Sequence, residues 1–194
     1  MTWLQEHMAF ILEITAVICG LAYVILAARN NIWCWLFGII GSFLSIILFY
    51  NFFDLVAESM LYVYYVGTGI YGWLNWNKMD SETDFTIVSK PIRVHLIVIG
   101  FGLVSASVLS LFIQKIFADA SYPLLDSFTT VFSIITTILV VKKWIENWLY
   151  WIVINSLTVY LYFSKGLNYY GLLTIFYVGM SVYGYIHWRK LKVS

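Results

Sequence analysis

The feature that most constrains this chain is a succession of apolar runs, each about as long as a lipid bilayer is thick. A helix needs about 20 mostly apolar residues to cross a hydrocarbon core of about 30 Å. Seven runs meet this requirement, and they are Met8–Ala28, Trp33–Phe53, Leu55–Trp76, Ile92–Phe117, Leu124–Val141, Trp148–Phe163 and Leu167–Trp188. The sequence therefore predicts an all-α integral membrane protein with seven transmembrane helices.

Composition supports this class and excludes others. The chain is 62% hydrophobic and 11% charged, whereas soluble domains carry about 25% charged residues. The net charge is +1 and the basic residues form no patch, so no nucleic-acid partner is expected. The cysteines and histidines lack metal-ligand spacing, and no phosphate-binding loop is present. We therefore expect no metal, no cofactor and no enzymatic activity.

The basic residues predict the orientation of the chain, because short positively charged loops stay in the cytoplasm. With seven spans, one side of the membrane receives only Lys115 and Lys165. The other side receives Arg29, Lys78, Lys90, Arg93, Lys142, Lys143, Arg189, Lys190 and Lys192. We expect a multi-pass membrane protein with the N-terminus outside and the C-terminus in the cytoplasm.

The sequence contains an internal repeat. Val63–Lys78 and Ile175–Lys190 match at a constant offset of 112, with YVG, YG, W and K in register. A weaker match pairs Glu13 with Asp126 at offset 113, and another pairs Ile40 and Ser42 with Ile154 and Ser156 at offset 114. Spans one to three therefore correspond to spans five to seven. An odd number of spans per copy plus one linking span makes the two copies parallel.

This repeat predicts the domain organisation. Residues 1–78 form the first three-helix repeat, residues 79–120 a cytoplasmic connector with linker helix four, and residues 121–194 the second three-helix repeat. The connector is the hydrophilic stretch Asn77–Lys90. Parallel duplication places a substrate site between the halves near mid-membrane in other transporters, so the same location is expected here.

The sixth span carries the most informative polar residue. Trp148, Trp151 and Asn155 stand at i, i+3 and i+7, on one helical face. Tryptophans near a span end are ordinarily interfacial, but an amide about two turns deep is costly unless it has a partner. Two indole faces and an amide suit a flat ligand with a polar edge. A hydrogen bond to a neighbouring helix is the alternative.

A second candidate cluster lies on the third span. Glu58, Tyr62 and Tyr65 share one side at i, i+4 and i+7. A carboxylate beside aromatic faces stabilises a desolvated cation. Hydrogen bonding between helices would explain Glu58 equally well.

The aromatic interior favours movement of a small solute, and a membrane receptor or subunit that transports nothing is the alternative from another class.

The segment from Glu146 to Asn155 resembles the WxxWxxxN signature of the Pnu family of bacterial vitamin transporters. Tyr71-Gly72-Trp73 and Asp126-Ser127 are similar to that family too. The resemblance implies a 3+1+3 fold like that of the SWEET proteins, commonly a homotrimer. It implies facilitated diffusion of an unphosphorylated vitamin that a cytoplasmic kinase traps. It also implies that Trp148, Trp151 and Asn155 bind the substrate.

One position departs from the nicotinamide riboside members of the family. Those members carry a glutamine eleven residues before the tryptophan of YGW, where this chain has Tyr62. Thiamine and nicotinamide riboside are both aromatic cations, and a carboxylate such as Glu58 suits the aminopyrimidine ring of thiamine. The resemblance therefore favours a thiamine carrier, with nicotinamide riboside as the alternative and riboflavin as a further family substrate.

Overall fold

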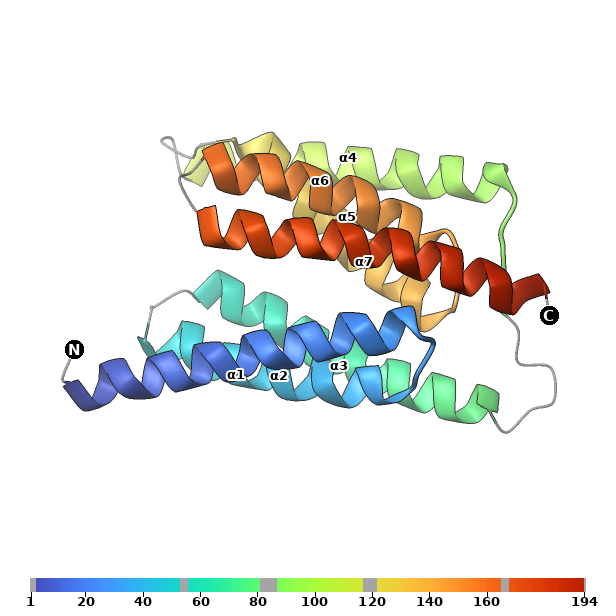
Figure 1. Ribbon diagram of the computed structural model, residues 1–194. Helices are drawn as coiled ribbons and strands as arrows, with labels where there is room; N and C mark the ends of the chain where they lie inside the picture. Colours follow the sequence, from blue (N-terminus) through green and yellow to red (C-terminus); the bar gives the residue numbers. More distant parts are fainter. Residues whose placement is uncertain (1–2, 53–55, 81–86, 117–121, 165–167, 194) are drawn as a thin grey trace. The chain divides into compact units, whose positions relative to one another are not determined.

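The computed structural model describes residues 3–52, 56–80, 87–116, 122–164 and 168–193. These residues form seven α-helices in chain order (Figure 1): α1 (Trp3–Ala28), α2 (Trp33–Phe52), α3 (Val56–Asp80), α4 (Ile92–Ile116), α5 (Pro123–Val141), α6 (Asn147–Ser164) and α7 (Asn168–Val193). A helix rises about 1.5 Å per residue, so each is about as long as a hydrocarbon core is thick. The predicted all-α class with seven helices is confirmed.

The helix boundaries differ from the predicted spans mainly at three ends. α1 begins at Trp3, before the predicted start at Met8, and two helices end later than predicted. α3 continues to Asp80 and α7 to Val193, past the predicted ends at Trp76 and Trp188. Helical hydrogen bonding does not stop where apolar residues stop, so both helices extend beyond their apolar parts. The hydrophilic connector therefore begins as helix. The predicted limits Phe53, Leu55, Phe117 and Leu167 lie outside the described residues.

Hydropathy alone recognises fewer spans than the fold contains. Within the described residues, His7–Ala28, Ile92–Ile116 and Pro123–Val141 are long and apolar enough to cross a membrane, and Trp33–Leu48 is a shorter apolar stretch. α3, α6 and α7 interrupt their aliphatic residues with tyrosine, tryptophan and asparagine. Such residues lower hydropathy scores although a helix that packs against other helices accommodates them readily.

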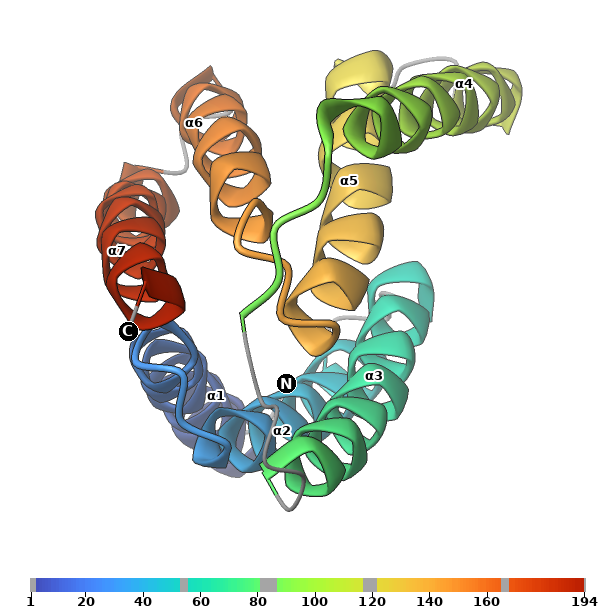
Figure 2. The same cartoon turned by 90° about the vertical axis from the view of Figure 1, so that its right-hand side faces the viewer.

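The chain divides into two compact units, Met1–Phe85 and Thr86–Ser194. In the first unit, α2 packs against both α1 and α3. In the second unit, α6 packs against both α5 and α7, and α4 packs against α5. Figure 2, which views the helices nearly end-on, shows α2 and α6 as the middle helices of the two triplets. The two parallel repeats are thus two three-helix rows, and α4 lies on the second.

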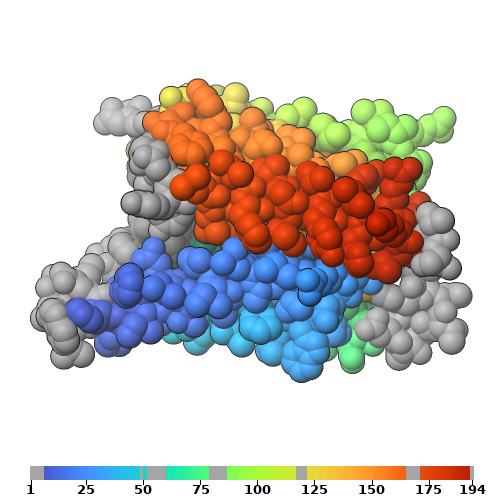
Figure 3. Space-filling view, viewed as in Figure 1, coloured from blue at the N-terminus to red at the C-terminus, as the bar shows by residue number. Residues whose placement is uncertain are grey.

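Helix α4 shows how the membrane shapes residue placement. Its outward stripe carries large apolar side chains, including Ile97, Phe101 and Val104, which are all exposed. Its buried residues are small or polar, and they are His95, Gly102, Ala106 and Ser110. Small residues allow close helix approach when lipid already satisfies the apolar side chains. Apolar side chains such as Leu172, Ile175 and Ile186 are similarly exposed on α7, whose surface is red in Figure 3.

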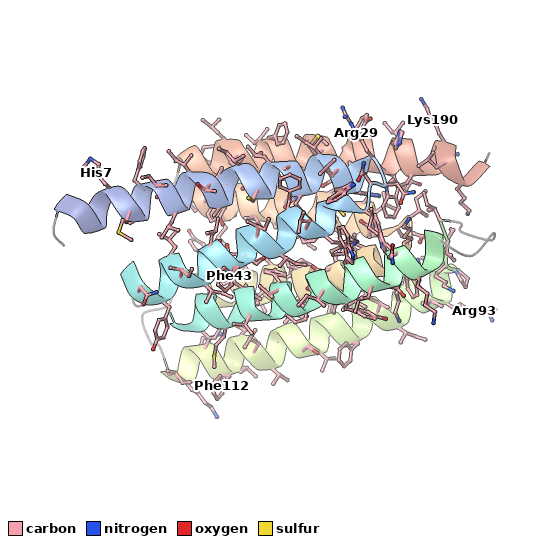
Figure 4. All side chains as sticks on the ribbon, turned by 90° about the horizontal axis from the view of Figure 1, so that it is seen from below. His7, Arg29, Phe43, Arg93, Phe112 and Lys190 are labelled. Atoms are coloured by element: carbon pink, nitrogen blue, oxygen red, sulfur yellow. The ribbon has the colours of Figure 1, made fainter. Side chains whose placement is uncertain are left out.

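Basic residues gather at one end of each unit. In the first unit, Arg29 lies at the opposite end of α1 from His7 (Figure 4). In the second unit, Arg93 lies at the opposite end of α4 from Phe112, and Lys190 of α7 lies at the same end as Arg93. The orientation of the chain in the membrane stays a prediction from the basic loops.

Candidate functional site

The turns that lead into α2 and α6 have the same structure. Asn30 and Lys143 both have left-handed backbone, with φ of 55° and 50°. In the first turn the Asn30 N–H donates to Ala27 O and the Asn31 N–H donates to Leu26 O. In the second turn the Lys143 N–H donates to Val140 O and the Trp144 N–H donates to Leu139 O. Both are Schellman motifs, which satisfy the last carbonyls of the preceding helix.

These turns set the register of the repeat in the middle helices. Because Asn30 corresponds to Lys143, the offset there is 113. α2 and α6 continue from these turns as unbroken helices, so Asn155 corresponds to Ser42. The weaker sequence match at offset 114, which paired Ser42 with Ser156, is therefore wrong. Hydrophobic helices resemble one another at several offsets, and only the turn geometry distinguishes them.

Each repeat places one tryptophan against a glycine of its third helix. The Trp148 ring lies on Gly184 of α7, where an added Cβ would come within 2.6 Å of ring atoms Cδ2 and Cε2. The Trp148 ring meets Trp188 edge-on, with centroids 5.5 Å apart and an interplanar angle of 87°. In the first repeat, Trp35 lies on Gly72 and meets Trp76 edge-on, at 5.4 Å and 87°.

The two tryptophan–glycine contacts are deeply buried. Trp148 is 2% exposed and Trp35 is 1% exposed. The indole Nε1 of each is buried without a hydrogen-bond partner in the part of the chain that the structure describes. The same arrangement in both repeats indicates that Trp148 holds α6 against α7. In this conformation its ring faces are occupied by protein.

Trp151 and Asn155 have a more open environment on α6. Both are only partly buried. Among the described residues, the Trp151 ring has no aromatic partner. Asn155 Nδ2 donates to Ser181 Oγ of α7 at 3.3 Å, and Asn155 Oδ1 accepts no hydrogen bond from the described chain. The amide therefore makes the hydrogen bond to a neighbouring helix that the sequence analysis gave as the alternative. Its carbonyl oxygen, Asn155 Oδ1, can still bind a ligand.

The third-span candidates lie in the first unit. The Tyr62 and Tyr65 rings meet edge-on, with centroids 5.9 Å apart and an interplanar angle of 68°. Tyr64 lies beside Tyr65, with ring centroids 5.5 Å apart. Glu58 belongs to the first turn of α3, but its side chain lies outside what the structure describes. An aromatic cluster therefore exists on α3, and each of its tyrosines makes further contacts.

The structure adds a polar cluster that sequence reasoning missed, at the start of α4. Glu146, the residue before α6, accepts hydrogen bonds from Ser89 Oγ and, at 3.2 Å, from the Lys90 N–H. The other Glu146 oxygen lies 3.6 Å from His95 Nε2. His95 Nδ1 lies 3.0 Å from the Tyr150 hydroxyl. Glu146 thus binds two residues of the segment that leads into α4, near the helix N-terminus, where the helix dipole favours negative charge.

A short backbone pairing completes the contact between α4 and the turn before α6. The Val88 N–H donates to Lys143 O at 3.0 Å and the Ile145 N–H donates to Val88 O at 2.9 Å. The Lys90 ammonium lies over the Trp144 ring, 5.4 Å from its centroid. The sequence signals for this cluster were His95, a histidine within an apolar run, and Glu146, an acid beside the tryptophan motif. The sequence could not predict that these two residues meet, because more than fifty residues separate them.

The described residues form neither a metal-binding cluster nor a disulfide. Within them no three His, Cys, Asp or Glu side chains come together as a metal site. Cys19 and Cys34 are buried free thiols.

Comparison with known proteins is consistent across sequence and structure. A family model described as nicotinamide mononucleotide transporter matches residues 10–190. The nicotinamide riboside transporter PnuC of Neisseria mucosa is 32% identical over 190 residues, covering 91% of this chain and 71% of that protein. PnuC of Escherichia coli K12 is 28% identical over 180 residues, covering 80% and 75%. The crystal structure of the vitamin B3 transporter PnuC matches with a TM-score of 0.71 and 27% identity, covering 100% of this chain and 93% of that one.

Proposed function

The chain belongs to the nicotinamide mononucleotide transporter family and is a multi-pass vitamin transporter of the bacterial inner membrane, and from this premise we propose that its substrate is unphosphorylated nicotinamide riboside. The nicotinamide riboside transporters of Neisseria mucosa and Escherichia coli are 32% and 28% identical to this chain, whereas a riboflavin/roseoflavin transporter of Streptomyces davaonensis is 23% identical. Their names favour this substrate over thiamine, which the sequence alone had favoured. The observation that carries the proposal is the open face of Trp151 and Asn155 on α6.

The chemistry of that face suits a nicotinamide ring. The ring is flat and cationic, so it stacks on an indole and gains cation–π attraction. Stacking of a base on an aromatic side chain contributes about 1–3 kcal/mol. The carboxamide at the ring edge can donate a hydrogen bond to Asn155 Oδ1. Trp148 acts in this proposal by holding α6 in place.

The tyrosines of α3 are proposed as the second part of the substrate-binding set. Tyr62 and Tyr65 contribute aromatic rings from the first repeat, and Glu58 precedes Tyr62 by one helical turn. Glu58 would balance the positive charge of the pyridinium. Tyr62 stands where family members that carry nicotinamide riboside have glutamine, so its hydroxyl would replace the glutamine amide toward the substrate.

The proposed mode of transport rests on the absence of a nucleotide-binding loop from the sequence, and the proposed orientation rests on the positions of the basic residues. The sequence contains no nucleotide-binding loop, so we propose facilitated diffusion, with net inward flux maintained by a cytoplasmic kinase that phosphorylates the vitamin. We propose the N-terminus outside and the C-terminus inside, supported by the basic end of each unit (Figure 4). A homotrimer in the bilayer is proposed from the family resemblance.

Uptake into proteoliposomes tests the proposal. Purified protein in vesicles without ATP or an ion gradient is expected to take up radiolabelled nicotinamide riboside saturably, and excess unlabelled riboside should compete. Unlabelled thiamine and riboflavin serve as competitor arms. Binding without uptake would favour a receptor. Saturable uptake of radiolabelled thiamine without saturable uptake of nicotinamide riboside would assign thiamine instead.

The Tyr62 assignment has its own test. Replacing Tyr62 with glutamine should raise the affinity for nicotinamide riboside relative to thiamine in the same competition assay. Tyr64→Gln is the matched control, because Tyr64 adjoins the cluster on a neighbouring face of α3. Equal effects of the two substitutions would remove Tyr62 from the substrate-binding set.

A further inference from the structure

We infer that Ser181 orients the Asn155 amide so that its carbonyl oxygen faces the ligand, which makes the site selective for ligands whose polar edge donates a hydrogen bond. The inference rests on the proposed function and concerns the same site. It assigns a positioning role to a residue of α7 outside the WxxWxxxN motif. The orientation of the amide depends on which acceptor receives the single Ser181 hydroxyl proton.

The Ser181 proton is already used. Ser181 is 1% exposed and its Oγ lies 2.7 Å from Tyr177 O, one turn earlier in α7. A backbone carbonyl can only accept, so the serine hydroxyl must donate there. A hydroxyl has one proton, and Ser181 Oγ therefore has only lone pairs left for other partners.

Those lone pairs decide which end of the Asn155 amide points at Ser181. The amide nitrogen and oxygen have nearly the same shape, so hydrogen-bond partners must distinguish them. The Asn155 atom 3.3 Å from Ser181 Oγ must be the donor Nδ2, because an oxygen there would place two acceptors together. Asn155 Oδ1 consequently points away from Ser181, and Asn155 is partly exposed.

The first repeat shows that the fold does not require this pair. The residues corresponding to Asn155 and Ser181 are Ser42 and Gly69. Gly69 packs against Ile39, where an added Cβ would come within 2.7 Å of Cγ1. The same helix pairing is thus built there from a glycine contact. An amide and an orienting hydroxyl occur in the second repeat alone, which favours a role in ligand recognition.

An acceptor facing the ligand selects between two closely similar molecules. Nicotinamide riboside presents a carboxamide N–H to Asn155 Oδ1. Nicotinic acid riboside has a carboxylate at the same position, which has no proton to donate and brings a negative charge against the amide oxygen. The wild-type protein should therefore bind the amide riboside at least tenfold more tightly than the acid.

Calorimetry on the full-length protein in nanodiscs tests this selectivity with both ribosides. In Ser181→Ala the amide can rotate and offer its NH2 to the carboxylate, so the amide-to-acid affinity ratio should fall at least fivefold. Ser156→Ala is the matched control, because Ser156 is exposed and its hydroxyl donates to Ile152 O within α6. Its ratio should equal that of the wild type.

A second variant tests the same atom independently. Asn155→Asp in the Ser181→Ala background has no NH2 group to turn toward the carboxylate and no serine oxygen beside it, so the amide-to-acid affinity ratio should return at least to the wild-type value. An unchanged ratio in Ser181→Ala, or a ratio that stays low in the double variant, would overturn the inference while the proposed function stands. Failure of the wild type to bind either riboside would overturn both.

Discussion

The contact between Gly184 and Trp148 makes a quantitative prediction about stability. In Gly184→Ala, the new Cβ would lie 2.6 Å from two atoms of the Trp148 ring and 2.8 Å from Cε3. Real Cβ contacts are not that short, so the ring or α7 must move. The ring cannot easily move, because it is 2% exposed and Trp188 meets it edge-on.

The expected magnitude comes from two opposing effects. Overpacking a buried contact costs about 1–3 kcal/mol. Replacing glycine with alanine inside a helix recovers about 1 kcal/mol. Gly179→Ala, one turn away in α7, meets nothing within 4 Å and receives only the second effect. The two variants should therefore differ in the free energy of unfolding by about 1–3 kcal/mol, or roughly 2–4 °C in Tm for each kcal/mol.

Thermal denaturation of the detergent-purified variants measures this difference. The first repeat supplies a replicate, because Gly72 lies against Trp35 whereas Gly67 meets nothing within 4 Å. Gly184→Ala and Gly72→Ala should melt below the wild type, and Gly179→Ala and Gly67→Ala at or above it. Equal melting of the members of each pair would refute the view that the two tryptophans are tightly packed contacts between helices.

Three further outcomes are expected. Trp151→Ala should weaken nicotinamide riboside binding at least tenfold in calorimetry, about 1.4 kcal/mol or more, with little change in Tm, whereas Trp148→Ala should lose about 3–5 kcal/mol of stability. The reverse pattern would exchange their roles. Glu146→Gln should lower Tm by weakening charge-assisted bonds to Ser89 and the Lys90 N–H, a loss of about 1–3 kcal/mol; an unchanged Tm would mean that α4 is held by its backbone pairing alone. A protease site fused after Ser194 should be cleaved in inverted membrane vesicles and protected in intact spheroplasts, and the opposite result would reverse the proposed orientation.

Much of the fold could be predicted from the sequence because lipid imposes a simple rule. Every backbone polar group must be satisfied within the membrane, so a long apolar run has to be a helix. The helix number followed from run length, and the repeat followed from YVG and YG in register at offset 112. Helix ends were less predictable. α3 and α7 extend past their apolar residues, since hydrogen bonding rather than hydropathy decides where a helix stops.

The candidate site was predicted in part. Helical spacing correctly placed Trp148 and Asn155 on one face, and both contact α7. Spacing could not distinguish a packed tryptophan from an open one. Trp148 and Trp151 are the same residue type three positions apart, and their environments differ because Gly184 leaves room for one ring. A glycine on another helix has no signature in the local sequence of α6.

The sequence by itself determined that this chain crosses a membrane as two parallel helix triplets with a linker, because apolar length and repeated letters are local properties. Tertiary structure alone decided which atoms meet. Glu146 binds Ser89 in the segment before α4, and Asn155 meets Ser181 on another helix. Such contacts depend on helix rotation and spacing, which arise from packing between distant segments. The orientation of the Asn155 amide depends on tertiary structure too, because the Ser181 hydroxyl donates its only proton to Tyr177 O.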